Sequence, residues 1–209
     1  MKKIKKSLLV LVAALIIISS VAPSFIYASE LNNSENSVSN KTYNKLSSEV
    51  KMIYRNLIKY DHSKNKFVVD EYKTEQYYNY NDESIKGVYL MKDSLNDELI
   101  NTGSTNYSEI INQKLSEIEY VLQGNDINNL IPQNTRMKRA ADFSWIQRCL
   151  KEAWGTAVSL VTLKGIVNLV KAGKFEAAAA KLAASTAGKI VGIAALFAFL
   201  ATCGATTVS

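Results

Sequence analysis

The stretch that decides the fold is the C-terminal tail, residues 140–209, which reads AADFSWIQRCLKEAWGTAVSLVTLKGIVNLVKAGKFEAAAAKLAASTAGKIVGIAALFAFLATCGATTVS. The tail is rich in Ala, Leu and Val, lacks proline, and holds both cysteines and both tryptophans of the chain. Its apolar side chains recur at helical spacing, and Lys171-Ala172-Gly173 is a typical helix stop. The sequence therefore predicts a helical hairpin or a three-helix bundle in this tail.

Within the tail we expect one helix from Trp145 through Val170, with Ser144 as its cap. Gly155 and Gly165 each weaken that helix locally by ~1 kcal/mol relative to alanine. A second helix is expected to start near Lys174, and the last segment, residues 190–201, is almost purely apolar.

Charge is distributed unevenly along the 209 residues. Residues 1–29 hold four lysines and no acid, so their net charge is +4. Residues 30–139 hold 14 basic and 16 acidic side chains, and the tail holds seven basic and three acidic ones, giving −2 and +4. This asymmetry suggests segments with separate fates, although it can also arise by chance.

The N-terminus has the three-part pattern of a secretory signal peptide. Four lysines precede an apolar run from Leu8 to Ile18, and small residues follow at Ala28-Ser29. The pattern predicts a signal helix over residues 1–28 that signal peptidase removes after Ala28, and hence a secreted, extracellular protein. The alternative is a transmembrane anchor, but the run is short for a hydrocarbon core of ~30 Å.

The middle of the chain predicts a small α+β pro-domain over residues 42–125, after a disordered Ser/Asn-rich linker over residues 29–41. One amphipathic helix is expected over Thr42–Tyr60 and a second over Asn106–Gln123. Residues 67–69 and 87–91 are candidate strands. The expected inward face of the first helix consists of Leu46, Val50, Ile53, Tyr54, Leu57 and Ile58. The predicted fold is thus mainly α with a small α+β part.

A cluster of basic residues, Arg136-Met137-Lys138-Arg139, stands in a predicted linker over residues 126–139, where the acidic middle meets the basic tail. Exposed linkers are preferred sites of proteolysis. We therefore expect a secreted processing protease to cut between Arg139 and Ala140. The alternative is a solvated linker that keeps two segments apart.

The tail combines positive charge with bulky apolar side chains. Lysines seven residues apart share a helix face, and basic stripes opposite apolar residues suit an anionic bilayer. Tryptophan suits the membrane interface. The alternative is an ordinary helical subdomain with an apolar core. The predicted membrane-contacting residues are Trp145, Trp154, Lys164, Lys171, Lys174, Lys181, Lys189, Phe197 and Phe199.

Cys149 and Cys203 are the two cysteines of a chain that we expect to be exported, so a disulfide between them is predicted. In a hairpin that turns near Gly173 they would lie at the same open end. Two free buried thiols are the alternative.

The sequence predicts no enzyme. His62 is the single histidine and stands in a polar turn, and we found no phosphate-binding loop or metal-ligand spacing. Four tyrosines at residues 72–80 could stack on bases, but the surrounding segment is acidic and phosphates require basic partners. No cofactor and no nucleic-acid partner are therefore expected.

The layout resembles the bacteriocin precursors of Gram-positive bacteria with a long pro-region and a C-terminal toxin, and the tail resembles the closticin type. The matching features are Trp145-Ile146-Gln147-Arg148-Cys149, Ala153-Trp154, the region of Lys171, the Ala/Lys helix Ala177–Lys181, and Cys203. The layout is also similar to that of sporulation-delaying toxins, whose cysteines lie close together, unlike those of this chain. The resemblance implies killing of related bacteria by membrane permeabilisation, and a separate immunity protein.

These features together predict a secreted precursor whose cationic tail, residues 140–209, is released as a membrane-active antimicrobial peptide. The expected partner is the anionic membrane of a target cell. The alternative prediction is a cell-surface protein that its C-terminal apolar hairpin anchors in the membrane.

Overall fold

The computed structural model describes residues 39–126, 129–130, 143–155, 158–185 and 191–205. All of them belong to one of the chain's two units, Asn33–Ser209. The predicted signal peptide with Ala28, the basic cluster with Arg139 and Ala140, and Lys189 lie outside the described residues. Nearly all of the linker predicted over residues 29–41 lies outside them too.

The first helix, α2 (Asn40–Met52), begins at Ser39, whose side chain accepts a hydrogen bond from the backbone N–H of Thr42. A π-helical turn, η1 (Ile53–Leu57), continues it, and the chain then becomes extended at Ile58. The predicted helix over Thr42–Tyr60 therefore ends early. Its six apolar residues are all buried as expected, but Ile58 reaches the core from a strand.

That strand, β1 (Ile58–Asp61), pairs antiparallel with β2 (Lys66–Val69), and Ile58 faces Val69 across the ladder. The predicted strand at residues 67–69 is confirmed. The polar turn between the strands is closed by Asp61, whose carboxylate accepts a hydrogen bond from the N–H of Ser63 at 2.9 Å. Phe67 is fully buried and fixes the hairpin on the core.

The second predicted strand, residues 87–91, is wrong, because this segment lies inside α4 (Asp82–Thr102). Asn81 caps α4 by accepting a hydrogen bond from the N–H of Ser84 at 2.9 Å, and acidic residues fill the first turn. Val88, Met91 and Leu95 are buried at spacings of three and four, the period of a helix. A short helix, α3 (Glu71–Tyr77), precedes α4.

The second amphipathic helix is confirmed as α5 (Tyr107–Leu122), capped by Asn106. Its inward side chains are buried as the apolar spacing predicts. The members of this face are Ile110, Leu115, Ile118, Val121 and Leu122.

Four helices form the described part of the tail: α6 (Ser144–Trp154), α7 (Leu160–Lys171), α8 (Phe175–Ser185) and α9 (Ile193–Ala205). The single helix expected from Trp145 through Val170 is divided in two. Gly155 has φ 57° and ψ −123°, a conformation that is strained for residues with a side chain. Ser159 then caps α7, and the stop at Gly173 is confirmed, with φ 73°.

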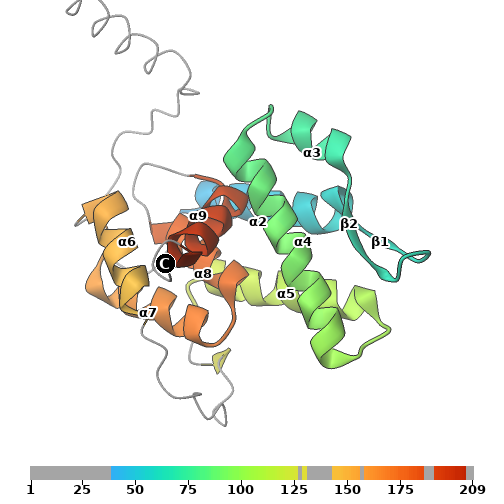
Figure 1. Cartoon of the computed structure of the whole chain (residues 1–209). Coiled ribbons are helices and arrows are strands. Elements are labelled where there is room, and N and C mark those ends of the chain that lie inside the picture. The colour runs from blue at the N-terminus through green and yellow to red at the C-terminus, as the bar shows by residue number, and fades with distance from the viewer. Residues whose placement is uncertain (1–38, 127–128, 131–142, 156–157, 186–190, 206–209) are drawn as a thin grey trace, which may run out of the picture. The chain divides into compact units, whose positions relative to one another are not determined.

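Helix α9 has its most extensive contacts with α4 and also packs on α8 and α6 (Figure 1). Helix α8 contacts α5, α7 and α2, so the tail and residues 39–126 share one core. The prediction of a mainly α fold with a small α+β part is confirmed, since the described residues form eight α-helices, one π-helical turn and a two-stranded sheet.

Candidate functional site: the interface between the N-terminal part and the tail

The site that best connects this fold to the sequence predictions is the interface between residues 39–126, called here the N-terminal part, and the tail. Its apolar centre is the crossing of α4 and α9 (Figure 1). A Cβ atom added at Gly87 of α4 would overlap the backbone of Ala194, so the missing side chain lets the two helices touch. The α9 side chains buried at the interface and in the shared core include Ile193, Leu196, Phe197 and Leu200.

A buried carboxylate of the N-terminal part caps helix α9. Glu49, on α2, is only 7% exposed and accepts hydrogen bonds from the N–H groups of Ile193 at 2.9 Å and Ala194 at 3.4 Å. The tail supplies no capping side chain there, because Gly192 precedes the helix and a Cβ on it would overlap the Glu49 carboxylate. The contact satisfies helix N–H groups that would otherwise lack partners and places negative charge at the positive end of the dipole.

Burial raises the pKa of Glu49. The hydrogen bonds from Ile193, Ala194 and the Tyr78 hydroxyl, which donates to Oε1 at 3.0 Å, act in the opposite direction without outweighing burial. The carboxylate therefore gains a proton more readily here than in water.

Two ion pairs of opposite polarity join α5 to the start of α8. Lys114 of α5 lies 3.7 Å from the carboxylate of Glu176, and these side chains are 4% and 2% exposed. One helical turn further on, Glu117 pairs with Lys174. A cation and an anion of the N-terminal part thus meet an anion and a cation of the tail.

Further polar groups surround the buried pair. The hydroxyl of Ser94, on α4, donates a hydrogen bond to Glu176 Oε1 at 2.6 Å, and Glu98 lies 3.3 Å from Lys114. Burial alone would lower the pKa of Lys114, but the carboxylates of Glu176, Glu98 and Glu117 together raise it. Lys114 is therefore held as a cation.

The cysteines lie on the first and last helices of the tail, α6 and α9. The structure places the sulfur atoms of Cys149 and Cys203 at disulfide distance, with the Cα atoms 6.3 Å apart. Such a Cα separation is typical of a disulfide. The predicted proximity of the two cysteines is thus confirmed.

The predicted membrane-contacting residues do not share one surface. Lys164 and Lys171 are exposed, whereas Lys174 pairs with Glu117 of the N-terminal part. Lys181 is half-buried, and burial lowers its pKa. Phe197 is buried, near Phe175.

The two predicted interfacial tryptophans are both partly buried in the tail. Trp154 contacts Phe199 edge to face, with ring centroids 4.8 Å apart, and Trp145 packs against the core. Aromatic side chains predicted to face lipid are thus held between tail helices in this state.

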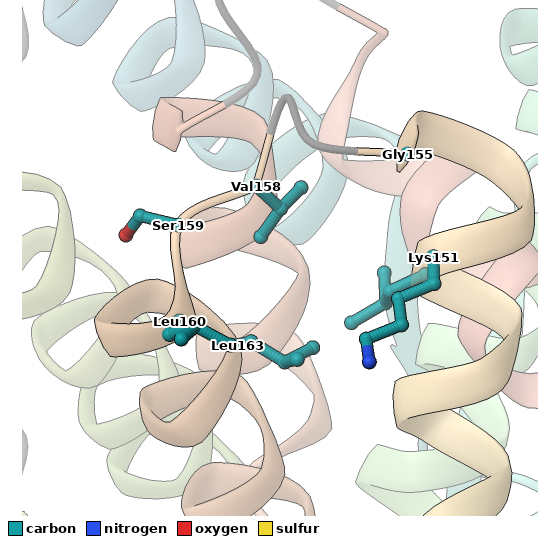
Figure 2. A pocket seen from close by; sticks show the side chains of 7 residues that line it. Lys151, Gly155, Val158, Ser159, Leu160 and Leu163 are labelled. Carbon is teal, nitrogen blue, oxygen red and sulfur yellow. The ribbon is translucent and has the colours of Figure 1, made fainter.

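A hollow of about 260 Å³ lies between α6 and the start of α7. Figure 2 shows Val158 and Leu163 facing Lys151 across it. Nearby, Leu160 and Val161 are 70% and 81% exposed, which is unusual for side chains of this kind. This end of the tail therefore presents apolar and basic side chains to solvent together.

His62 belongs to an aromatic cluster on the hairpin, with its ring edge to face against Tyr60 and Tyr107. The part of the chain that the structure describes has no group of three His, Cys, Asp or Glu side chains placed to hold a metal ion. Within the same residues, every helix is too short or too polar to cross a bilayer.

Reasoning from the sequence missed Glu49, Gly87, Lys114 and Glu176 as members of a site. One signal was present, because the apolar segment after Gly192 begins without a Ser, Thr, Asp or Asn to cap it. That absence indicates a cap from elsewhere, but the sequence does not say which residue provides it. Comparison of the chain with protein-family models, curated proteins and solved structures finds no match.

Proposed function

We propose that the chain is the secreted precursor of a cationic, membrane-active antimicrobial peptide, residues 140–209, released by cleavage after Arg139. The single observation that supports this most is the environment of α9. The most apolar helix of the tail is buried against α4, so its separation from the N-terminal part would expose a large apolar surface. Such a surface on a positively charged peptide favours binding to an anionic bilayer.

Charge adds to the attraction. The tail has seven basic and three acidic side chains, and each Lys or Arg near an anionic surface contributes roughly 1 kcal/mol. Separation would free Lys174 from Glu117, which adds a cation to those already exposed at Lys164 and Lys171. Leu160 and Val161 would provide a first apolar contact.

The N-terminal part would then act as the pro-region, which covers the apolar helix and neutralises part of the tail's charge before release. A disulfide between Cys149 and Cys203 would keep α6 and α9 together in the released peptide. A target-cell membrane, a processing protease and a separate immunity protein are the partners of this proposal.

The test uses the full chain expressed in a secreting Gram-positive host, with mass spectrometry of the culture supernatant. The expected product is a fragment of seventy residues that begins at Ala140. The control variant replaces Arg136, Lys138 and Arg139 by glutamine and should stay uncut.

The fragment, purified away from the rest under denaturing conditions and returned to buffer, should release dye from vesicles of anionic lipid. It should do so more strongly than from neutral vesicles, and should inhibit Gram-positive indicator strains. A fragment that neither releases dye nor inhibits growth would refute the proposal. An uncut chain found in the membrane fraction would support the alternative of a cell-surface protein.

A further inference from the structure

We infer that the N-terminal part remains bound to the tail after the peptide bond is cut and acts as its dedicated inhibitor. It would recognise the tail by the crossed ion pairs between α5 and α8 and by the Glu49 cap on α9. This inference rests on the proposed function, and it adds that cleavage alone does not release an active peptide.

The position of the cut leaves the interface intact. The expected cleavage site lies between the two sets of interface residues, so hydrolysis breaks one backbone bond and none of the contacts described above. The packing of α9 on α4, of α8 on α5 and of α8 on α2 is non-covalent. In each pair, one helix precedes the cleaved bond in the chain and the other follows it. These contacts persist as long as both pieces stay folded.

Separation would also leave a buried anion without its cation. Lys114 and Glu176 are almost completely buried. Lys114 would keep Glu98 of its own piece, but Glu176 would lose Lys114, which is strongly unfavourable for a buried carboxylate unless the pieces rearrange. The hydrogen bond from Ser94 to Glu176 would be lost as well.

The order of the charges makes the contact specific. Lys114 and Glu117 are three residues apart on α5 and so point to one side of that helix. Across the interface Lys114 meets Glu176, and Glu117 meets Lys174, so that each charge faces its opposite. A sequence with the opposite order at these positions would place like charges together, so the pattern selects this tail in this register.

The Glu49 cap adds a contact with the backbone of the tail. The Glu49 carboxylate occupies the space that Gly192 leaves free and bonds two N–H groups of α9. The N-terminal part thereby binds the backbone at the start of the apolar helix as well as its side chains. A larger residue in place of Gly192 would displace the Glu49 carboxylate and so disturb the cap.

The experiment inserts a site-specific protease sequence after Arg139 in the full chain and cuts the purified protein. The expected result is that both pieces elute together in size-exclusion chromatography and that the cut complex releases little dye from anionic vesicles. Elution as two separate species, with an active tail in the second, would overturn the inference while leaving the proposed function intact. A tail that co-elutes after the cut, but releases no dye once it has been separated under denaturing conditions and returned to buffer, would refute the proposed function and leave the binding intact.

Charge reversal then tests the recognition. Glu176→Lys and Lys114→Glu alone should each weaken association of the cut pieces by at least about a hundredfold. The double variant K114E/E176K should recover part of that loss, because it restores opposite charges across the interface but places the new carboxylate beside Glu98. Matched controls are Glu152→Lys and Lys86→Glu, which make the same charge changes at exposed positions on the tail and on α4.

Circular dichroism of the uncut variants shows whether each one folds. Glu176→Gln keeps the side-chain size and serves as a milder variant should a reversal prevent folding; it should weaken association less than Glu176→Lys does. Equal effects of Glu152→Lys and Glu176→Lys, or no recovery in a folded double variant, would overturn the role of the ion pairs.

Discussion

The carboxylate of Glu49 accepts a hydrogen bond from the N–H of Ile193 at 2.9 Å, although 144 positions separate the two residues in the chain. One residue lies on the first helix of the N-terminal part and the other begins the last helix of the tail. The contact makes the start of α9 depend on a side chain from the opposite end of the described protein. Separation of the two parts therefore removes both the cover and the cap of the most apolar helix.

Removal of the cap should lower stability. Glu49→Ala leaves the N–H groups of Ile193 and Ala194 without their acceptor, and the loss of a cap costs about 1–2 kcal/mol in the free energy of unfolding. Urea unfolding of the full chain, followed by circular dichroism, measures the change. Asp97→Ala, at an exposed position on α4, is the control and should have little effect. Equal stability of both variants would contradict the capping role.

The buried Glu49 should also give stability a particular dependence on pH. Burial raises its pKa above 4.5, so the folded state binds the proton more tightly than the unfolded state does. Stability contributed by this group is therefore highest below pH 4.5 and declines as pH rises from there through the folded-state pKa. The difference in unfolding free energy between the natural chain and Glu49→Gln should fall across that window. Denaturation series from pH 4 to pH 8 measure this difference. A difference that increases with pH would contradict the prediction.

Glu119 provides the contrasting case within the same molecule. The hydrogen bond with Lys51 lowers the pKa of Glu119, so any stability it contributes is present above pH 4.5 and is lost as pH falls below that value. Glu119→Gln should differ from the natural chain by a constant amount above pH 6, and that difference should shrink as pH falls below 4.5. The same denaturation series, extended to about pH 2.5, separates the two groups.

Gly87→Ala should destabilise the protein, although the same change in an exposed helix normally stabilises it by ~1 kcal/mol. The added methyl group would overlap the backbone of Ala194, so α9 must move away from α4. Overpacking of this kind costs typically about 1–3 kcal/mol. Lys86→Ala, at the exposed neighbouring position, is the control. Thermal unfolding of both variants checks the sign, and a more stable Gly87→Ala would show that the close approach does not exist in solution.

Loss of the cysteine pair should loosen the tail. The two cysteines are 54 positions apart, and closure of a loop of that length stabilises by about 4 kcal/mol in the chain-entropy model. The variant Cys149→Ser/Cys203→Ser should unfold at a lower temperature than the oxidised protein, and close to the reduced one. Alkylation of the unreduced chain followed by intact-mass measurement shows directly whether the thiols are paired. Two alkylated cysteines would refute the disulfide.

Local patterns predicted much of this fold. The apolar spacing in α5 and the glycine stop after α7 are short-range signals, and both are confirmed. The strand predicted at residues 87–91 was wrong because Val88 and Tyr89 favour strands locally and Gly87 is a poor helix former. The helical spacing of Val88, Met91 and Leu95, and the cap at Asn81, decide the outcome.

The interface could not be predicted in the same way. Glu49 and Glu176 look like ordinary acidic residues of amphipathic helices, and their burial depends on partners far along the chain. The division of the long tail helix depends on the conformation of Gly155, for which propensity gave only a weak signal. The apolar excess of residues 190–201 indicated unusual surroundings, and in this structure those surroundings are α4, α6 and α8.

The crossing of α4 and α9 has a consequence for the order of synthesis. A ribosome completes α4 long before it reaches Ala194, so Gly87 and the neighbouring Val88 stay uncovered until α9 has been made. Until then the nascent chain exposes an unfilled apolar strip. The native packing is therefore attainable only after α9 is synthesised, and a chain truncated before α9 would leave that strip open to aggregation or to a chaperone.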